Sequence, residues 1–315
     1  MNLRAVPRPG LRRALLPVLA ALLAVVALPG CSSKPDRPHI VVTTNILGDI
    51  TRRIAGDEAR VQVLMKPNAD PHSFGLSATD AASLEQADLV VFNGLGLEEN
   101  VLRHVDNARE SGVPTLEVGA GVDPLAYGAG QGDAGQQDPH FWTDPERVRK
   151  ATGLIADEIT AHVDGADDRA VAKNAERYRK ELASLTTWMT ESFDRIPAGR
   201  RALVTNHHVF GYLAERFDFR VVGAVIPSGT TLASPSSSDL RSLTRAMDKA
   251  GVRTIFADSS RPQKLADVLR KEMGGDVRVV ELYSESLTGK GGGADTYLAM
   301  MRANTGAIVA GLAGP

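Results

Sequence analysis

Three histidines stand in similar surroundings along the chain, and imidazole is the commonest metal ligand among protein side chains. Each follows an apolar run typical of a strand and precedes a segment typical of a helix. They occur in Pro71-His72-Ser73-Phe74, Asp138-Pro139-His140-Phe141-Trp142 and Asn206-His207-His208-Val209-Phe210. A single histidine of this kind is more often hydrogen-bonded to a carbonyl group, but three in equivalent positions predict one metal site. His208 adjoins His207, and on this reasoning alone either could be the third ligand.

Strands and helices that must position these histidines alternate along the sequence. Strands are predicted at residues 40–43, 61–65, 88–92, 202–205, 220–223, 254–257 and 277–280, and helical patterns at 46–55, from Ser77, from Thr143, at 238–249 and at 263–271. Such alternation predicts an α/β protein of two doubly wound lobes with mostly parallel sheets. In open α/β sheets, ligands bind beyond the carboxyl ends of the strands. The metal site is therefore expected in the cleft between the lobes.

One amphipathic segment interrupts the alternation. Apolar side chains recur at steps of three and four at Val171, Ala175, Tyr178, Leu182, Leu185, Met189 and Phe193, with charged residues between them. This period predicts a helix that ends near Pro197 and runs for roughly 35–40 Å. We expect this long, rigid helix to join the two lobes.

The N-terminal residues have the composition of an export signal. Four arginines precede an apolar run from Ala14 to Leu28, which ends at Leu28-Pro29-Gly30-Cys31. The run is short for a membrane-spanning helix, and its end resembles a bacterial lipobox, in which the cysteine carries lipid. The alternative is a plain secretory peptide with an incidental cysteine. Cys31 is the only cysteine, so disulfides and thiolate metal sites within the chain are excluded.

Length and charge set the remaining limits. The 315 residues suit two lobes plus a leader. The expected organisation is a signal peptide at 1–30, a lipid-anchored tether at 31–38, an N-terminal α/β lobe at 39–168, the linking helix at 169–197 and a C-terminal α/β lobe at 198–315. A net charge of −2, from 36 basic and 38 acidic residues, offers no field for nucleic acid. We expect no nucleic-acid partner.

Several motifs together resemble the cluster A-I (cluster 9) metal-binding solute receptors of ABC transporters, the zinc and manganese receptor family. The resemblance runs from about Ile40 to the C-terminus. Its motifs are Pro67-Asn68-Ala69-Asp70-Pro71-His72-Ser73-Phe74, Asp138-Pro139-His140-Phe141-Trp142-Thr143-Asp144-Pro145, Thr205-Asn206-His207-His208-Val209-Phe210-Gly211-Tyr212, Leu282-Tyr283-Ser284-Glu285-Ser286-Leu287 and Thr296-Tyr297-Leu298-Ala299-Met300-Met301. The family has two lobes joined by a long rigid helix, which agrees with the amphipathic segment.

The resemblance implies a ligand set. His72, His140 and His207 match the family's imidazole ligands, and His207 matches because it lies three places before Phe210. The fourth ligand in the family is usually an aspartate in a Tyr-x-Asp-Ser-Leu motif, and this chain has Glu285 there. The additional methylene could change the denticity of the carboxylate or admit water. Asp258 and Asp295 are the alternatives for the fourth ligand.

Three imidazoles and one carboxylate favour Zn²⁺, since manganese prefers more oxygen ligands. Manganese receptors of the resembling family commonly have glutamate at the position of His207, which also favours zinc. The predicted function is capture of Zn²⁺ and its delivery to an ABC importer, without catalysis. The same role for manganese is the first alternative, and a secreted zinc metallohydrolase is the second. Residues 123–137 contain no histidine, so no auxiliary metal-gathering loop is expected.

The predicted partners are an ABC permease with its ATPase, and a lipid bilayer reached through the N-terminal lipid. We expect a monomer on the outer face of the cytoplasmic membrane. Metal release is predicted to involve a small shear or loop motion, with Gly289 to Gly293 as the moving element.

Overall fold

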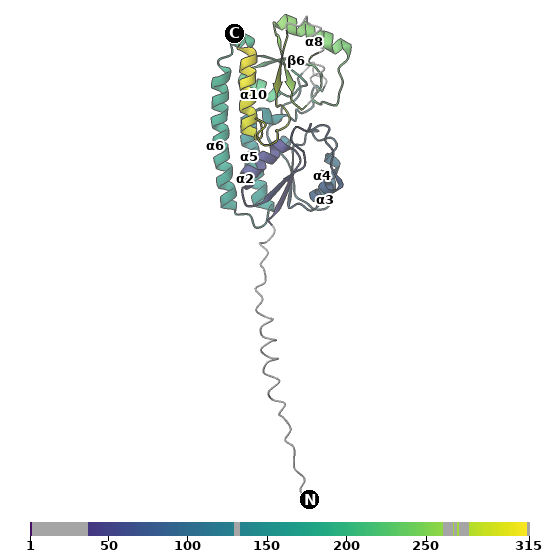
Figure 1. Ribbon diagram of the computed structural model, residues 1–315, viewed down its shortest axis with the longest axis vertical. Helices are drawn as coiled ribbons and strands as arrows, with labels where there is room; N and C mark the ends of the chain where they lie inside the picture. Colours follow the sequence, from purple (N-terminus) through teal and green to yellow (C-terminus); the bar gives the residue numbers. More distant parts are fainter. Residues whose placement is uncertain (2–36, 129–132, 261–266, 268–269, 271–276, 314–315) are drawn as a thin grey trace. The chain divides into compact units, whose positions relative to one another are not determined.

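The structure, a computed structural model, describes Met1 and residues 37–128, 133–260, 267, 270 and 277–313 (Figure 1). The predicted signal peptide, Cys31 and nearly all of the tether lie outside the described residues, as does most of the helix predicted at 263–271. The chain divides into two compact units, Met1–Arg37 and Pro38–Pro315. Every element below belongs to the second unit.

The first lobe is built on a parallel sheet. Its strands are β1 (His39–Val42), β2 (Arg60–Val63), β3 (Leu89–Phe92) and β4 (Thr115–Glu117), and its helices are α2 (Asn45–Ala55), α3 (Ala78–Glu85), α4 (Leu102–Glu110) and α5 (Pro145–His162). The strand order is β2-β1-β3-β4, and each pair is parallel. Ile40 and Val42 face one apolar core and Val41 the other. Both faces of this sheet are therefore covered.

The second lobe repeats this plan. Its strands are β5 (Ala202–Thr205), β6 (Arg220–Ala224), β7 (Thr254–Asp258) and β8 (Arg278–Leu282), and its helices include α7 (Gly211–Phe217), α8 (Ser237–Ala250) and α10 (Tyr297–Leu312). The strand order is β6-β5-β7-β8, again with parallel pairs. Among the described residues there are thus two four-stranded parallel sheets, and the predicted fold class of two α/β lobes is confirmed.

The predicted long helix is α6 (Asp168–Phe193), which has 26 residues and a length of about 39 Å. Every member of the predicted apolar stripe, from Val171 to Phe193, is buried. This helix packs against α2 and α5 of the first lobe and α10 of the second, as Figure 1 shows. Residues 194–197 continue as turns, so the helix itself ends one turn before Pro197.

Several elements differ from the sequence predictions, and helices α4, α7 and α10 were not predicted. Strand β4 was not predicted, because Thr115–Glu117 is too short to show an alternating pattern. Helix α5 is capped by Asp144, which accepts a hydrogen bond from the Glu146 amide, rather than by Thr143. The helix predicted from Ser77 begins with a capping box, in which Ser77 and Asp80 form reciprocal bonds. None of the described helices is long and apolar enough to cross a membrane.

A candidate metal centre

Two of the three predicted histidines are held by the same local motif. In Asp70-Pro71-His72 and in Asp138-Pro139-His140, the aspartate Oδ1 accepts a hydrogen bond of 2.9 Å from the histidine backbone amide. This local bond fixes the loop backbone without the hydrogen bonds of a strand or helix. The repeated Asp-Pro-His sequence is a signal for the paired turns that the sequence analysis did not use.

The other two candidate ligands come from the second lobe. His207 directly follows β5, and its carbonyl accepts a hydrogen bond of 2.7 Å from the Thr205 hydroxyl. Glu285 lies in the loop after β8. His72, His207 and Glu285 therefore extend from loops beyond the carboxyl ends of strands. His140 immediately precedes the 3₁₀ turn Phe141–Thr143.

These four side chains meet. One ligand atom from each of His72, His140, His207 and Glu285 lies within 4.8 Å of every other. The Glu285 Oε1 atom is 2.9 Å from the Nε2 atom of His72, 3.1 Å from that of His207 and 3.4 Å from that of His140. The Nε2 atoms of His72 and His140 are 3.4 Å apart. A tetrahedron with metal–ligand distances of about 2.0–2.1 Å has edges of about 3.3–3.4 Å, which these spacings approach.

The cluster is buried, and several of its polar atoms have no hydrogen-bond partner among the described residues. Each of its four residues is at most 1% exposed. The Nδ1 atoms of His72 and His207 and the Oε2 atom of Glu285 are buried without a hydrogen-bond partner. Buried polar atoms without partners are rare and require a reason. A cation bound at Nε2 and at the carboxylate is such a reason for Glu285, because Oε2 can then serve as a second oxygen ligand.

Charge at the centre is concentrated on two carboxylates. Burial opposes ionisation of Glu285, but His207, His72 and His140 outweigh it and hold the pKa of Glu285 well below its usual range. Burial would lower the pKa of His140, but Asp138 and Glu285 together raise it to about 9. Two carboxylates around three imidazoles would balance the two charges of a divalent cation.

His140 is oriented by a second hydrogen-bonding shell. Its Nδ1 atom lies 2.7 Å from Asp138 Oδ1 and 3.2 Å from the Tyr127 hydroxyl oxygen. A carboxylate on Nδ1 fixes the tautomer that leaves Nε2 free to bind metal. Asp138 therefore both shapes the loop and aims the ring.

The alternatives left open by the sequence lie elsewhere. Asp258 is fully buried but accepts hydrogen bonds from the Ser260 and Ser284 hydroxyls, and burial followed by the charge of Glu285 raises its pKa. Asp295 accepts a hydrogen bond from the Gly291 amide. Neither belongs to the four-residue cluster of the described chain.

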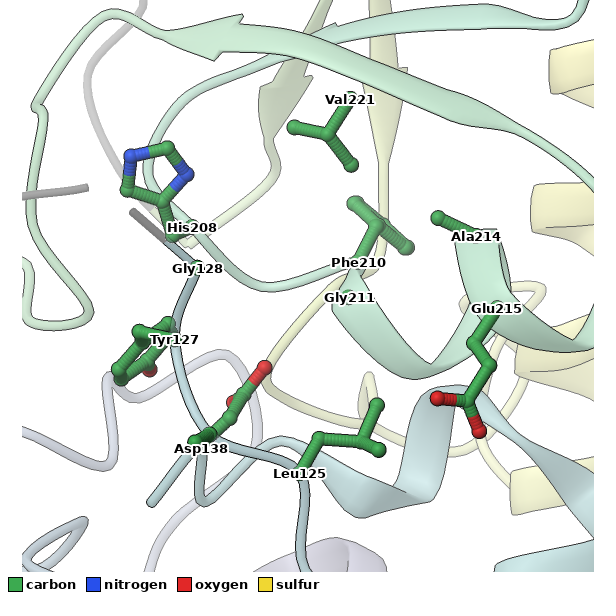
Figure 2. A pocket seen from close by; sticks show the side chains of 11 residues that line it. Leu125, Tyr127, Gly128, Asp138, His208, Phe210, Gly211, Ala214, Glu215 and Val221 are labelled. Carbon is green, nitrogen blue, oxygen red and sulfur yellow. The ribbon is translucent and has the colours of Figure 1, made fainter. Parts of the chain in front are cut away.

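His208 also lies outside the cluster. It lines a pocket of about 200 Å³ with Tyr127 and Asp138, and none of the four cluster residues is among the lining residues (Figure 2). Burial and the neighbouring His207 lower its pKa to about 4. Figure 2 shows its ring turned away from Asp138, while the carboxylates of Asp138 and Glu215 line the opposite wall.

Comparison with known proteins agrees with this architecture. The family described as "Zinc-uptake complex component A periplasmic" matches residues 40–311. A manganese-binding lipoprotein of Halalkalibacterium halodurans is 28% identical, with 90% of this chain and 91% of that protein covered. An iron-binding protein of Yersinia pestis is 29% identical, with 86% and 85% covered.

The solved structure of a periplasmic zinc-binding protein from Treponema pallidum superposes with a TM-score of 0.80 at 27% identity. The superposition covers 88% of this chain and all of the other. The family match spans most of the chain, so the protein belongs to this family of metal-binding substrate receptors of ABC transporters. The predicted resemblance is confirmed, whereas the relatives are named for three different metals.

Proposed function

We propose that this protein captures Zn²⁺ outside the cytoplasm and delivers it to an ABC importer. The observation that supports this most strongly is the spacing of three imidazole Nε2 atoms around Glu285 Oε1, at 2.9, 3.1 and 3.4 Å. Nitrogen-rich, near-tetrahedral sites suit zinc, and His72, His140, His207 and Glu285 are the proposed ligands. The metal is the transported substrate, and the chain supplies binding without a chemical step.

Manganese is the second candidate, and a specific feature favours it. Glu285 Oε2 has no hydrogen-bond partner, so the carboxylate can bind through both oxygens and raise the coordination number to five. Higher coordination with more oxygen ligands suits manganese. The manganese-binding relative from Halalkalibacterium halodurans points the same way.

Competitive titration separates the two metals. The protein beginning after Cys31, freed of metal, is titrated with Zn²⁺ and with Mn²⁺ against chelators of known affinity, and its native metal content is measured by elemental analysis. Most nitrogen and oxygen sites bind zinc more tightly than manganese, so zinc affinity at least 100-fold above manganese affinity supports the proposal only together with zinc in the protein purified from its native host. Comparable affinities together with manganese in the protein purified from its native host would replace it with the manganese role. Catalytic turnover of ester or phosphate substrates by the zinc-loaded protein would indicate the metallohydrolase instead.

The location outside the cytoplasm and the lipid anchor are also part of the proposal. The motif at Cys31 supports them, and several relatives are named lipoproteins. Labelling with a radioactive fatty acid in cells tests the anchor. Label that disappears in Cys31→Ser, with release of the protein from the membrane fraction, is the expected result. Equal labelling of both proteins would place lipid elsewhere.

A further inference from the structure

A loop of the second lobe contacts the first lobe beside the metal centre. This loop, Pro227–Leu232, follows β6, and we call it the latch loop. The Thr231 hydroxyl donates a hydrogen bond of 2.7 Å to Asp70 Oδ2. The Ser228 hydroxyl and the Gly229 amide donate to Asp133 Oδ2 at 2.9 and 2.5 Å. The Thr230 hydroxyl also donates to Glu99 Oε1 at 3.4 Å. Three carboxylates of the first lobe therefore hold the latch loop.

Asp70 links this loop directly to a candidate ligand. Its Oδ1 atom accepts from the His72 backbone amide at 2.9 Å, while its Oδ2 atom accepts from Thr231. Asp70 is 8% exposed and Thr231 is 5% exposed, so water competes little for either bond. One buried carboxylate thus connects the turn that carries His72 with the latch loop.

The latch loop is also tied to the segment that carries His207. The His208 amide donates to the Ser228 carbonyl at 3.0 Å, and the Ile226 amide donates to the Asn206 carbonyl at 2.8 Å. These backbone bonds lie on both sides of His207. A movement of the latch loop away from the first lobe would therefore carry His207 with it.

Glu285, in contrast, is fastened to the first lobe although it follows a strand of the second. The Trp142 indole donates to the Ser284 carbonyl at 2.8 Å. The Leu287 amide donates to Asn45 Oδ1 at 2.9 Å, and the Leu287 carbonyl accepts from the Asn68 amide at 3.0 Å. The ligand set is thus divided into His72 and His140 of the first lobe, Glu285 on a segment bonded to the first lobe, and His207, which is held with the latch loop.

The loop that carries Glu285 is also bonded to the second lobe. A relative movement of the two lobes would therefore pivot close to Glu285. The Tyr283 amide and carbonyl pair with the Asn304 side chain of α10, and the Ser284 hydroxyl donates to Asp258. Segment 283–287 is therefore bonded to both lobes, whereas the hydrogen bonds described above from the latch loop to the first lobe all end on side-chain carboxylates. Parting of the lobes would begin at the latch loop.

We propose that the Thr231–Asp70 hydrogen bond controls metal release, because it is a buried contact of the latch loop with the first lobe. Its rupture leaves the loop on less buried contacts with Asp133 and Glu99, and the loop can then withdraw His207 from a half-site of His72, His140 and Glu285. Thr231 and Asp70 are positioning residues that touch no metal. This inference rests on the proposed function. It places the moving element in the latch loop instead of the Gly289 to Gly293 run, which is closed on itself by a hydrogen bond from the Gly292 amide to the Gly289 carbonyl.

The test is the rate of metal dissociation from Thr231→Val, measured by stopped flow from the zinc-loaded protein into excess chelator. Valine keeps the shape and removes the hydroxyl. Hydrogen bonds to charged groups are strong enough that we expect dissociation to accelerate about 10-fold or more. The matched control is Thr305→Val, because Thr305 is 1% exposed and its hydroxyl donates at 2.7 Å within α10 to the Met301 carbonyl. The control should release zinc at the unaltered rate.

A spectroscopic readout separates positioning from general damage. The visible absorption spectrum of the Co²⁺-loaded protein reports the geometry of the first coordination shell, and it should be the same for Thr231→Val and the unaltered protein. A changed spectrum would mean that Thr231 shapes the site itself and would overturn the proposed role. Equal dissociation rates for Thr231→Val and the unaltered protein would also overturn it.

A second variant keeps the inference testable if Thr231→Val folds poorly. A Cβ atom at Gly229 would lie 2.2 Å from the Tyr127 hydroxyl oxygen, so Gly229→Ala must displace either the latch loop or Tyr127 while leaving the Thr231 hydroxyl in place. An unchanged spectrum of the Co²⁺-loaded variant shows that Tyr127 and His140 have not moved. We expect faster release from this variant too, and an unchanged rate contradicts the inference. Failure of the unaltered protein to bind Zn²⁺ or Mn²⁺ would instead refute the proposed function, and with it the inference.

Discussion

Acidification should weaken metal binding by an amount that follows from His140. In the metal-free protein, Asp138 and Glu285 overcome the effect of burial and raise the pKa of His140 to about 9. Its imidazole is therefore protonated at neutral pH, and a metal ion can bind Nε2 only after that proton leaves. Affinity should rise with pH up to about 9 and then level off.

The slope follows from one displaced proton. Below the pKa, each pH unit changes the apparent affinity about tenfold, so the change from pH 8 to pH 6 is about 100-fold, or about 3 kcal/mol. Glu285 adds little to this slope, because its pKa is held well below its usual range by the surrounding histidines after burial is overcome. Protonation of another ligand in the same window would make the slope steeper.

Isothermal titration calorimetry at pH 7 in buffers of different ionisation enthalpy measures the displaced protons directly. We expect about one proton per Zn²⁺, together with the 100-fold change in affinity between pH 8 and pH 6. Asp138→Asn removes the charge that most raises the pKa of His140, so fewer protons should be released by this variant at pH 8. An affinity independent of pH in the unaltered protein would show that His140 is either uncharged before binding or not a ligand.

The remaining predictions concern stability and the carboxylate. The pKa of His140 in the folded protein lies above the ordinary 6.5, so the protonated ring stabilises the metal-free fold below pH 6.5. This stabilisation is lost as the pH rises from 6.5 to 9. The melting temperature of the metal-free protein should therefore fall between pH 6.5 and pH 9. Zinc at 100 times its Kd should add about 2.7 kcal/mol, measured by chemical denaturation. Glu285→Gln should reduce zinc affinity by more than the roughly 10–100-fold expected for a residue that does not touch the metal. Asp295→Asn should bind zinc with unaltered affinity in the same competitive titration. Glu285→Asp should also bind more weakly, since it withdraws the carboxylate from three imidazoles.

Elements with a strong local pattern could be predicted from the sequence. The apolar stripe of α6 is continuous from Val171 to Phe193, and all of its members are buried. The four strands of each sheet follow from short β-branched runs, except β4, whose three residues are held mainly by pairing with β3. Periodicity thus predicts elements that are long or apolar, while a short edge strand depends on a partner that the sequence does not identify.

The candidate site was predictable in part. The choice of His207 over His208 came from the family motif, and the structure separates them, because His207 faces Glu285 while His208 lines a neighbouring pocket. The choice of Glu285 over Asp258 also came from the motif. Asp258 ends β7, and Glu285 follows the neighbouring strand β8 by three residues. The structure distinguishes them, because the Ser260 and Ser284 hydroxyls bind Asp258 whereas Glu285 contacts the three histidines. Contacts such as Asp70 with Thr231 span 161 positions, and no local pattern specifies them.

A substrate receptor of an importer must bind its ion and also release it. The distribution of the ligands between the two lobes permits both. His72 and His140 of the first lobe, with Glu285 on a segment bonded to both lobes, form a half-site that persists when the latch loop withdraws, so the ion loses one imidazole before it loses the others. Losing one ligand of four costs far less than losing all at once, so the barrier to release is divided into smaller steps. The latch loop then decides when the first step occurs, since its bonds to Asp70 and Asp133 and its backbone bonds on both sides of His207 hold that ligand in the site.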